Sequence, residues 1–165
     1  MAIQTLGFII PTLSLGGAER VVARLAEGLA RDFRCVLFLR RGGVCLFPMA
    51  NVAVVEIDYT AAGIRRAVEE HGIDLVLDHY HWDADHVRLM ATLADEGLRI
   101  VLTEHNAWHY PLFQSARDQR PGYEYWFQER YAYYRKFAAV TLLNEETSTA
   151  FAAHLDNQRV IPNPI

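Results

Sequence analysis

The chain has 165 residues, which is the size of one ordinary domain. Apolar residues make up 52% and charged residues 22%, a composition that excludes disordered and collagen-like chains. The formal net charge of −4 argues against a general nucleic-acid binder, which normally carries a basic excess.

Other features of the sequence concern the cellular compartment. No apolar run approaches the roughly 20 residues that span a bilayer. No basic residues precede the first apolar stretch, so we expect no signal peptide. The two cysteines, Cys35 and Cys45, have no CxxC spacing and suit free thiols in a reducing compartment. The expected location is therefore the cytoplasm.

Short apolar runs alternate with amphipathic segments along the chain. Residues 3–10 predict a buried strand, and residues 17–31 predict a helix with one apolar face. The connection from 40 to 52 is too short for a full helix, and residues 104–121 predict a long loop. Further strands are expected at 35–39, 52–57, 73–77, 98–103, 138–143 and 159–161, and further helices at 60–70, 83–96, 122–137 and 145–155.

Continuous apolar strands separated by helices indicate a parallel sheet that is covered on both faces. The expected fold class is α/β, a doubly wound, Rossmann-like, mostly parallel sheet of about six or seven strands with helices on both faces. Ligands bind such sheets beyond the carboxyl ends of the strands. Candidate site residues therefore lie in segments 11–17, 78–85 and 104–109, and at Asn144.

The first candidate is the junction Ser14-Leu15-Gly16-Gly17-Ala18-Glu19-Arg20, between the first strand and the first helix. Without a Cβ, paired glycines let backbone N–H groups approach a phosphate, and a helix N-terminus adds partial positive charge. A tight turn explains the same residues equally well.

The second candidate is residues 78–86, which contain three histidines and three aspartates. His79 and His81 face the same way on an extended chain, so both could bind a metal ion. Their spacing matches no standard zinc site, however. The alternative is a polar loop that lines a cleft, with Asp83 capping the helix that follows.

The third candidate is Thr103-Glu104-His105-Asn106, followed by His109. A histidine at this edge could bond to a ligand hydroxyl or to a developing charge. His105 could equally be a loop histidine with ordinary partners. Glu104 is either a general base or a surface carboxylate.

The fourth candidate is the aromatic helix predicted at 122–137, where one stripe contains Tyr123, Trp126 or Phe127, Arg130, Tyr134 and Phe137. Such a stripe is more often core than binding site. Its tyrosine hydroxyls and basic residues leave a contact with a partner or a membrane surface open. No Gly-x-Ser-x-Gly motif supports a hydrolase.

Together these segments resemble glycosyltransferase family 4, whose members have the GT-B fold. The most specific part is Gly16-Gly17-Ala18-Glu19-Arg20-Val21 in its strand-to-helix setting. Weaker matches follow in the family's order: Asp74-Leu75-Val76 with His79-Tyr80-His81, Thr103-Glu104-His105-Asn106, Ala139-Val140 with Asn144-Glu145, and Val160-Ile161-Pro162-Asn163-Pro164-Ile165.

The resemblance implies a two-domain enzyme that transfers a sugar from a nucleotide-sugar to a carbohydrate or lipid-linked acceptor. Residues 1–165 would form its acceptor-side N-terminal domain, without the C-terminal domain that holds most of the donor site. Members are usually retaining and metal-independent, with the nucleotide-sugar as co-substrate and no further cofactor. The isolated domain is therefore expected to be inactive.

The resemblance also implies roles for individual residues. Gly16 and Gly17 would face the donor diphosphate, and His105 would be the catalytic residue near the transferred sugar. Asn144 stands where the family usually has serine. The other candidates would line the acceptor cleft: His79, His81, Glu104, Asn106, His109 and Asn144.

Two other functions remain open from the sequence. A single-domain binding module would use the same cleft without catalysis, and a metal hydrolase would use His79, His81, Asp83 and His105. A domain without its partner domain would also expose apolar surface near residues 104–121, which self-association would cover. Peripheral contact with the cytoplasmic membrane face is open too, since lipid-linked acceptors are common in the family.

Overall fold

The computed structural model describes residues 3–106 and 123–163. A 7-stranded sheet has the order β3-β2-β1-β4-β5-β6-β7, and each neighbouring pair is parallel. The strand order reverses between β1 and β4, which is the switch point of a doubly wound sheet. The predicted α/β fold class is confirmed.

Most elements agree with the sequence pattern to within a few residues at each end. The strands are β1 (Thr5–Ile9), β2 (Arg34–Arg40), β3 (Val52–Ile57), β4 (Leu75–Asp78), β5 (Ile100–Glu104), β6 (Ala139–Leu142) and β7 (Gln158–Val160). The helices are α1 (Gly17–Leu29), α2 (Ala61–His71), α3 (Ala84–Asp95), α5 (Tyr123–Tyr134) and α6 (Glu145–Phe151).

Helix α6 is shorter than the predicted 145–155. It ends at Phe151 because the chain must turn back toward β7. Asn157, just before β7, is held against the end of α5, since its side-chain amide donates to the carbonyl oxygens of Tyr134 and Phe137 at 3.0 and 2.8 Å.

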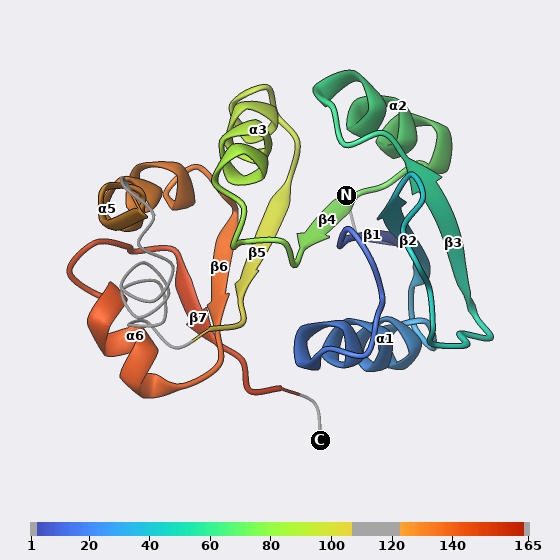
Figure 1. Cartoon of the computed structure of the whole chain (residues 1–165), viewed down its shortest axis with the longest axis horizontal. Coiled ribbons are helices and arrows are strands. Elements are labelled where there is room, and N and C mark those ends of the chain that lie inside the picture. The colour runs from blue at the N-terminus through green and yellow to red at the C-terminus, as the bar shows by residue number, and fades with distance from the viewer. Residues whose placement is uncertain (1–2, 107–122, 164–165) are drawn as a thin grey trace.

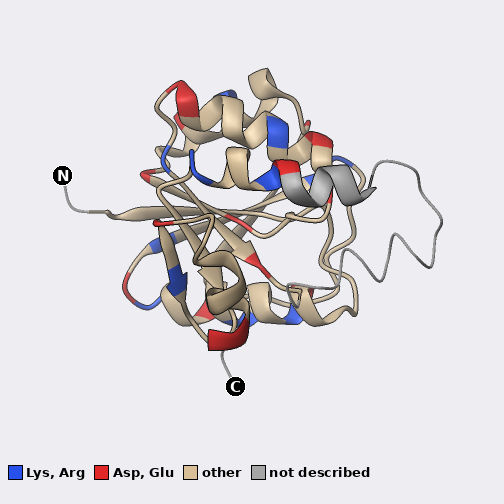
Figure 2. Ribbon diagram, turned by 90° about the vertical axis from the view of Figure 1, so that its left-hand side faces the viewer, with Lys and Arg blue, Asp and Glu red and all other residues tan. Residues whose placement is uncertain are grey.

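The helices lie on both sides of the sheet (Figure 1, Figure 2). Helices α2, α3 and α5 cover one face, and α1 covers the other face beside β1 and β2. Helix α6 lies at the β7 end, where Phe151 packs against Tyr131 and Tyr134 of α5. Side chains alternate along each strand between the two cores. In β1, Ile9 belongs to the α2–α3 side and Phe8 to the α1 side.

Caps fix several helix ends. Thr60 and Asp83 accept hydrogen bonds from the backbone N–H groups of Gly63 and His86, at 3.1 and 2.9 Å. The expected N-cap role of Asp83 is therefore confirmed. Gly72 closes α2 in the left-handed conformation, with φ of 60°, which glycine adopts without steric cost.

The connection from β2 to β3 contains no helix, as its length predicted. Residues 43–47 run instead beside the loop that follows β1. Leu13 pairs there with Cys45, donating its N–H to the Val44 carbonyl oxygen and accepting from the Leu46 N–H. This pairing places two loops of the carboxyl edge next to each other.

The cysteines and the helices bear on two further expectations from the sequence. Cys35 and Cys45 are free thiols, the first buried and the second exposed. No helix within the described ranges is long and apolar enough to cross a bilayer. Acidic and basic residues are interspersed in the view of Figure 2.

Candidate functional site

The candidate residues lie on opposite sides of the carboxyl edge. At the end of β4, Asp78 faces the α3 side and His79 faces the α1 side. At the end of β5, Glu104 faces α5 and His105 turns to meet His79. The edge therefore holds several polar groups rather than one.

His79 and His105 form the first group. Nδ1 of His79 lies 2.9 Å from Nε2 of His105, and the ring centroids are 5.1 Å apart. His79 is fully buried and stacks on Phe8, and its Nε2 has no hydrogen-bond partner among the described residues. Burial, followed by the electrostatic effect of His81, lowers the pKa of His105 to about 4. Burial also lowers the pKa of His79 well below its usual value. Both rings are therefore neutral at neutral pH.

Glu104 is the centre of the second group and is only 1% exposed. Tyr134 donates to Oε2 at 2.9 Å, and Nη1 of Arg130 lies 3.2 Å from the same oxygen. Nε2 of His81 lies 2.6 Å from Oε1, a close contact that is not a well-aligned hydrogen bond and is an ion pair only when the imidazole is protonated. Burial alone would raise the pKa of Glu104, but His81 and Arg130 outweigh it and lower the pKa to about 2. The alternative of a surface carboxylate is wrong, and a carboxylate with this pKa is a weak base.

Asn106 belongs to the second group through His81, which in turn lies near His105. Its Nδ2 lies 3.0 Å from Nε2 of His81, whose ring centroid is 6.0 Å from that of His105. His79 and His81 thus have different partners, contrary to the expectation from an extended chain, because β4 ends at Asp78. The structure brings together five predicted site residues: His79, His81, Glu104, His105 and Asn106.

The glycine junction lies on the same side of the sheet as His79. Gly16 is the N-cap of α1, and no side chain caps this end. The Glu19 carboxylate accepts a hydrogen bond from the Ser14 hydroxyl at 3.0 Å and lies beside Gly16, where a Cβ would clash with it. A Cβ on Gly17 would meet no atom within 4 Å. The backbone at Gly17 is therefore open.

Two predicted residues do not join the cluster. Asn144 is exposed and caps α6, accepting from the Thr147 N–H at 2.8 Å. The helix cap expected of a residue replacing serine is therefore present. His109 lies outside the described residues.

Helix α5 supplies two residues of the site that the sequence analysis assigned only to an aromatic stripe. The core interpretation of that stripe is confirmed for Arg130, Tyr134 and Phe137, all of which are buried. Sequence reasoning missed that Arg130 and Tyr134 hold Glu104. The available signal was an arginine within an apolar stripe, which requires a buried anion as its partner.

A third group lies on the α3 side. Nε2 of His86 lies 3.0 and 3.1 Å from the two carboxylate oxygens of Asp78. Asp83 accepts from the His86 backbone N–H and from the Tyr80 hydroxyl. Asp83 therefore lies apart from the histidines with which a metal hydrolase would need to combine it. The described residues contain no group of three or more His, Cys, Asp or Glu that could hold a metal ion.

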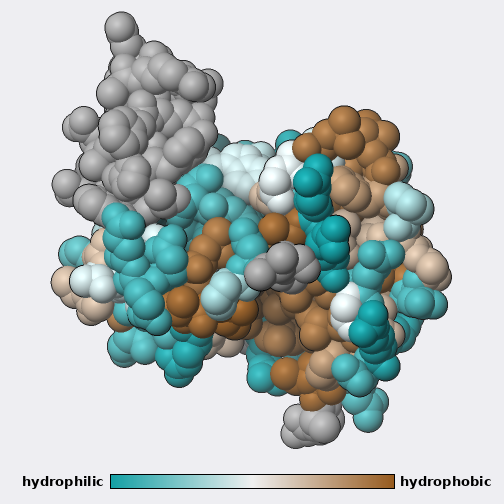
Figure 3. All heavy atoms as spheres, turned by 90° about the horizontal axis from the view of Figure 1, so that it is seen from below, coloured by the Kyte–Doolittle hydropathy of each residue, from teal (hydrophilic) through white to brown (hydrophobic). Residues whose placement is uncertain are grey.

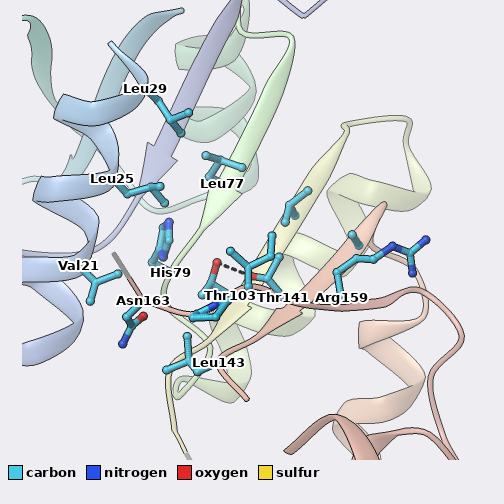
Figure 4. A pocket seen from close by; sticks show the side chains of 14 residues that line it. Val21, Leu25, Leu29, Leu77, His79, Thr103, Thr141, Leu143, Arg159 and Asn163 are labelled. Carbon is cyan, nitrogen blue, oxygen red and sulfur yellow. Dashed lines mark hydrogen bonds between the residues drawn. The ribbon is translucent and has the colours of Figure 1, made fainter. Parts of the chain in front are cut away.

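An apolar groove of about 480 Å³ adjoins His79 on the α1 side (Figure 4). Val21, Leu25 and Leu29 of α1 form one wall, and residues of β4, β5 and β6 form the floor. Figure 3 shows hydrophobic residues in the hollow between the two halves of this face. Thr141 donates to the Thr103 hydroxyl at 2.9 Å, so the floor's hydroxyls are paired.

The comparison with protein families decides which family the site belongs to. The model for Glycosyltransferase Family 4 matches residues 15–165. The chain belongs to glycosyltransferase family 4. The resemblance carried by the glycine junction is thereby confirmed, and the site described above is the carboxyl edge of a family 4 domain.

Solved structures support the GT-B architecture of this family 4 domain. Sucrose-phosphate synthase from Thermosynechococcus elongatus has a TM-score of 0.74 at 13% identity, over 96% of this chain and 48% of that one. HepE of Anabaena, solved with UDP and glucose, has a TM-score of 0.63 at 12% identity, over 99% and 45%. HepE with UDP-glucose has a TM-score of 0.66 at 13% identity, over 98% and 44%. At such identities the likeness shows the fold alone. The chain spans less than half of each of these proteins. No curated protein matches its sequence.

Proposed function

We propose that this family 4 domain is the acceptor-binding half of a glycosyltransferase that moves a sugar from a nucleotide-sugar to an acceptor. In this proposal the transfer retains the configuration at the anomeric carbon and needs no metal ion. HepE was solved with UDP-glucose, which makes a nucleotide-sugar the natural donor class to test. Since the chain spans less than half of the similar structures, the isolated domain should lack transferase activity.

One juxtaposition supports the proposal most strongly. The start of α1 at Gly16 and Gly17 lies on the same side of the carboxyl edge as His79 and His105. A helix N-terminus with free N–H groups attracts a phosphate, and the open Cβ position at Gly17 allows close approach. A donor diphosphate at α1 would therefore place its sugar on the side of the sheet that carries the imidazole pair.

His105 is proposed to act as an uncharged polar group beside the transferred sugar. Its Nε2 is engaged by His79, which leaves Nδ1 to meet a sugar hydroxyl. The low pKa keeps the ring neutral at neutral pH. A neutral ring can exchange a hydrogen bond with the sugar while positive charge develops at the anomeric carbon, and it adds no repelling charge of its own.

The experiment is a titration of the isotope-labelled 165-residue chain with UDP-glucose, followed by the NMR shifts of its backbone amides. Binding should be weak, with a dissociation constant on the order of 1 mM, because half of a cleft supplies few contacts. The shifts should concentrate in residues 14–20. Gly17→Ala should weaken binding about tenfold by placing a methyl group against the diphosphate. Gly28→Ala changes the same helix at another open position and is the matched control.

Several outcomes would contradict the proposal. A non-catalytic module that does not bind the donor would show no shifts in residues 14–20. Equal weakening by the two alanine substitutions would remove the role of the glycine junction. Release of UDP from UDP-glucose by the chain alone, tested with a panel of sugar acceptors, would show that these residues already form a complete active site.

A further inference from the structure

A cluster on the α2–α3 side of the carboxyl edge takes no part in the proposed donor site. Arg40 ends β2, Tyr59 follows β3, and Tyr80 and Trp82 follow β4. The guanidinium carbon of Arg40 lies 5.1 Å from the ring centroid of Tyr59 and 5.7 Å from that of Tyr80. The ends of three successive strands thus bring one cation against two aromatic rings.

The two rings under Arg40 are firmly held. The Tyr59 hydroxyl donates to the Phe38 carbonyl oxygen at 3.0 Å, and the Tyr80 hydroxyl donates to Asp83 at 2.8 Å. Burial, together with the bond to Asp83, raises the pKa of Tyr80 to about 12. Both phenols are therefore neutral at neutral pH. The rings attract Arg40 through their faces without neutralising its charge.

Arg40 contrasts with the arginine next to it. Arg41 forms an ion pair with Asp58 at 2.8 Å. In the described part of the chain, Arg40 forms no such pair within 4 Å. The nearby Asp83 carboxylate accepts from the His86 N–H and the Tyr80 hydroxyl, and it also interacts with the charge of Arg40 from beyond ion-pair distance.

The exposed Arg40 side chain thus has the features of an anion-binding group. Contact with the two rings and with the Tyr80 hydroxyl restricts the guanidinium, while its exposure leaves further N–H groups open to solvent. Such a preorganised fork matches the two oxygens of a phosphate or a carboxylate.

Trp82 adds a surface suited to a sugar ring. It is 38% exposed, and its ring stands edge-on to Tyr80 at a centroid distance of 5.1 Å. Tyr80 therefore contacts both Arg40 and Trp82. Flat aromatic side chains provide large contact areas at low entropic cost, because they have only two rotatable bonds.

We infer that Arg40 and Trp82 bind an anionic carbohydrate, with Arg40 on its phosphate or carboxylate group and Trp82 against its sugar ring. This inference rests on the proposed function, because it names the class of acceptor: a sugar phosphate or an acidic sugar rather than a neutral one. The anion lies on the α2–α3 side of the edge, and the donor diphosphate on the α1 side.

The test uses the 165-residue chain without any donor. The probes are glucose 6-phosphate, glucuronate and methyl glucoside, and binding is followed by NMR at the indole N–H of Trp82, assigned with Trp82→Phe. At least one anionic probe should bind about tenfold more tightly than the neutral glucoside, since one charge-assisted bidentate contact is lost with the neutral sugar. The stronger of the two anionic probes identifies the anion as phosphate or carboxylate.

Arg40→Gln should abolish the preference for the anionic probes, while Arg41→Gln should retain it. Equal binding of all three probes, binding of none, or equal losses in the two variants would overturn the inference. Circular dichroism of both variants checks that the fold is kept. Because no UDP-glucose is present, failure here with normal shifts in residues 14–20 would leave the proposed function standing. Anion binding that depends on Arg40, without UDP-glucose shifts in residues 14–20, would support this inference and contradict the proposed donor site.

Discussion

Replacing His105 by glutamine should change how the stability of the domain depends on pH. The pKa of this histidine falls from 6.5 to about 4 in the native state, because the ring is buried and lies near His81. Between these two values the unfolded chain binds a proton that the native state does not. The free energy of unfolding must therefore decrease as the pH is lowered through this interval. Above pH 6.5, where His105 is neutral in both states, none of this stability is lost.

The size of the effect follows from the shift. The pKa of His105 is 6.5 in the unfolded chain and about 4 in the native state. This difference corresponds to about 3 kcal/mol of unfolding free energy, at roughly 1.36 kcal/mol per pKa unit. About 2 kcal/mol of this falls between pH 7 and pH 5. This interval largely avoids the titration of Glu104, whose native pKa is about 2. Glutamine retains a polar group toward His79 but cannot bind the proton.

Urea unfolding at pH 7, 6 and 5, followed by far-ultraviolet circular dichroism, measures the effect. The wild-type chain should lose about 2 kcal/mol more than His105→Gln over this range. His154→Gln is the control, because His154 is exposed and distant in the fold from the cluster. Parallel pH dependence of the wild type and His105→Gln would refute the assignment of a neutral, buried imidazole.

Other substitutions test the packing around the site. Gly63→Ala should lower stability by about 1–3 kcal/mol, because its Cβ would lie 2.2 Å from the Asp58 carbonyl oxygen. Gly28→Ala should instead raise it by about 0.5–1 kcal/mol, since that helical position is open; thermal melts that shift both variants the same way would contradict this pair. Tyr134→Phe should lower the free energy of unfolding in urea by about 1–3 kcal/mol, because buried Glu104 loses a donor. An unchanged urea midpoint would show that this bond does not contribute.

Much of the fold could be predicted because each local signal is short-range. Continuous apolar runs specify buried strands, and residues such as Asp83 and Gly72 end the helices through bonds to their own neighbourhood. The parallel order of the strands then follows from the helical connections. For the same reason, His79, Glu104 and His105 could be placed at one edge before any contact was known.

The partners of those residues could not be predicted in the same way. Glu104 is held by Arg130 and Tyr134, which lie 26 and 30 residues further along the chain. Nothing local in the sequence fixes how α5 is rotated against β5. The prediction that His81 faces the same way as His79 was also wrong. The alternation of side chains holds only within a strand, and β4 ends at Asp78. Where regular structure stops, side-chain direction depends on tertiary contacts.

The glycines separate what the fold requires from what a ligand would require. Gly63 is needed because the Asp58 carbonyl oxygen leaves no room for a Cβ, and Gly72 and Gly97 have positive φ angles. Gly17 has neither reason among the described residues, since its Cβ position is open and its φ is not in the left-handed region. Gly17 is the first residue of α1, and neither packing nor backbone conformation calls for a glycine there. A diphosphate approaching the bare backbone would supply the missing reason, and this is why Gly17→Ala separates the proposed donor site from the stability of the fold.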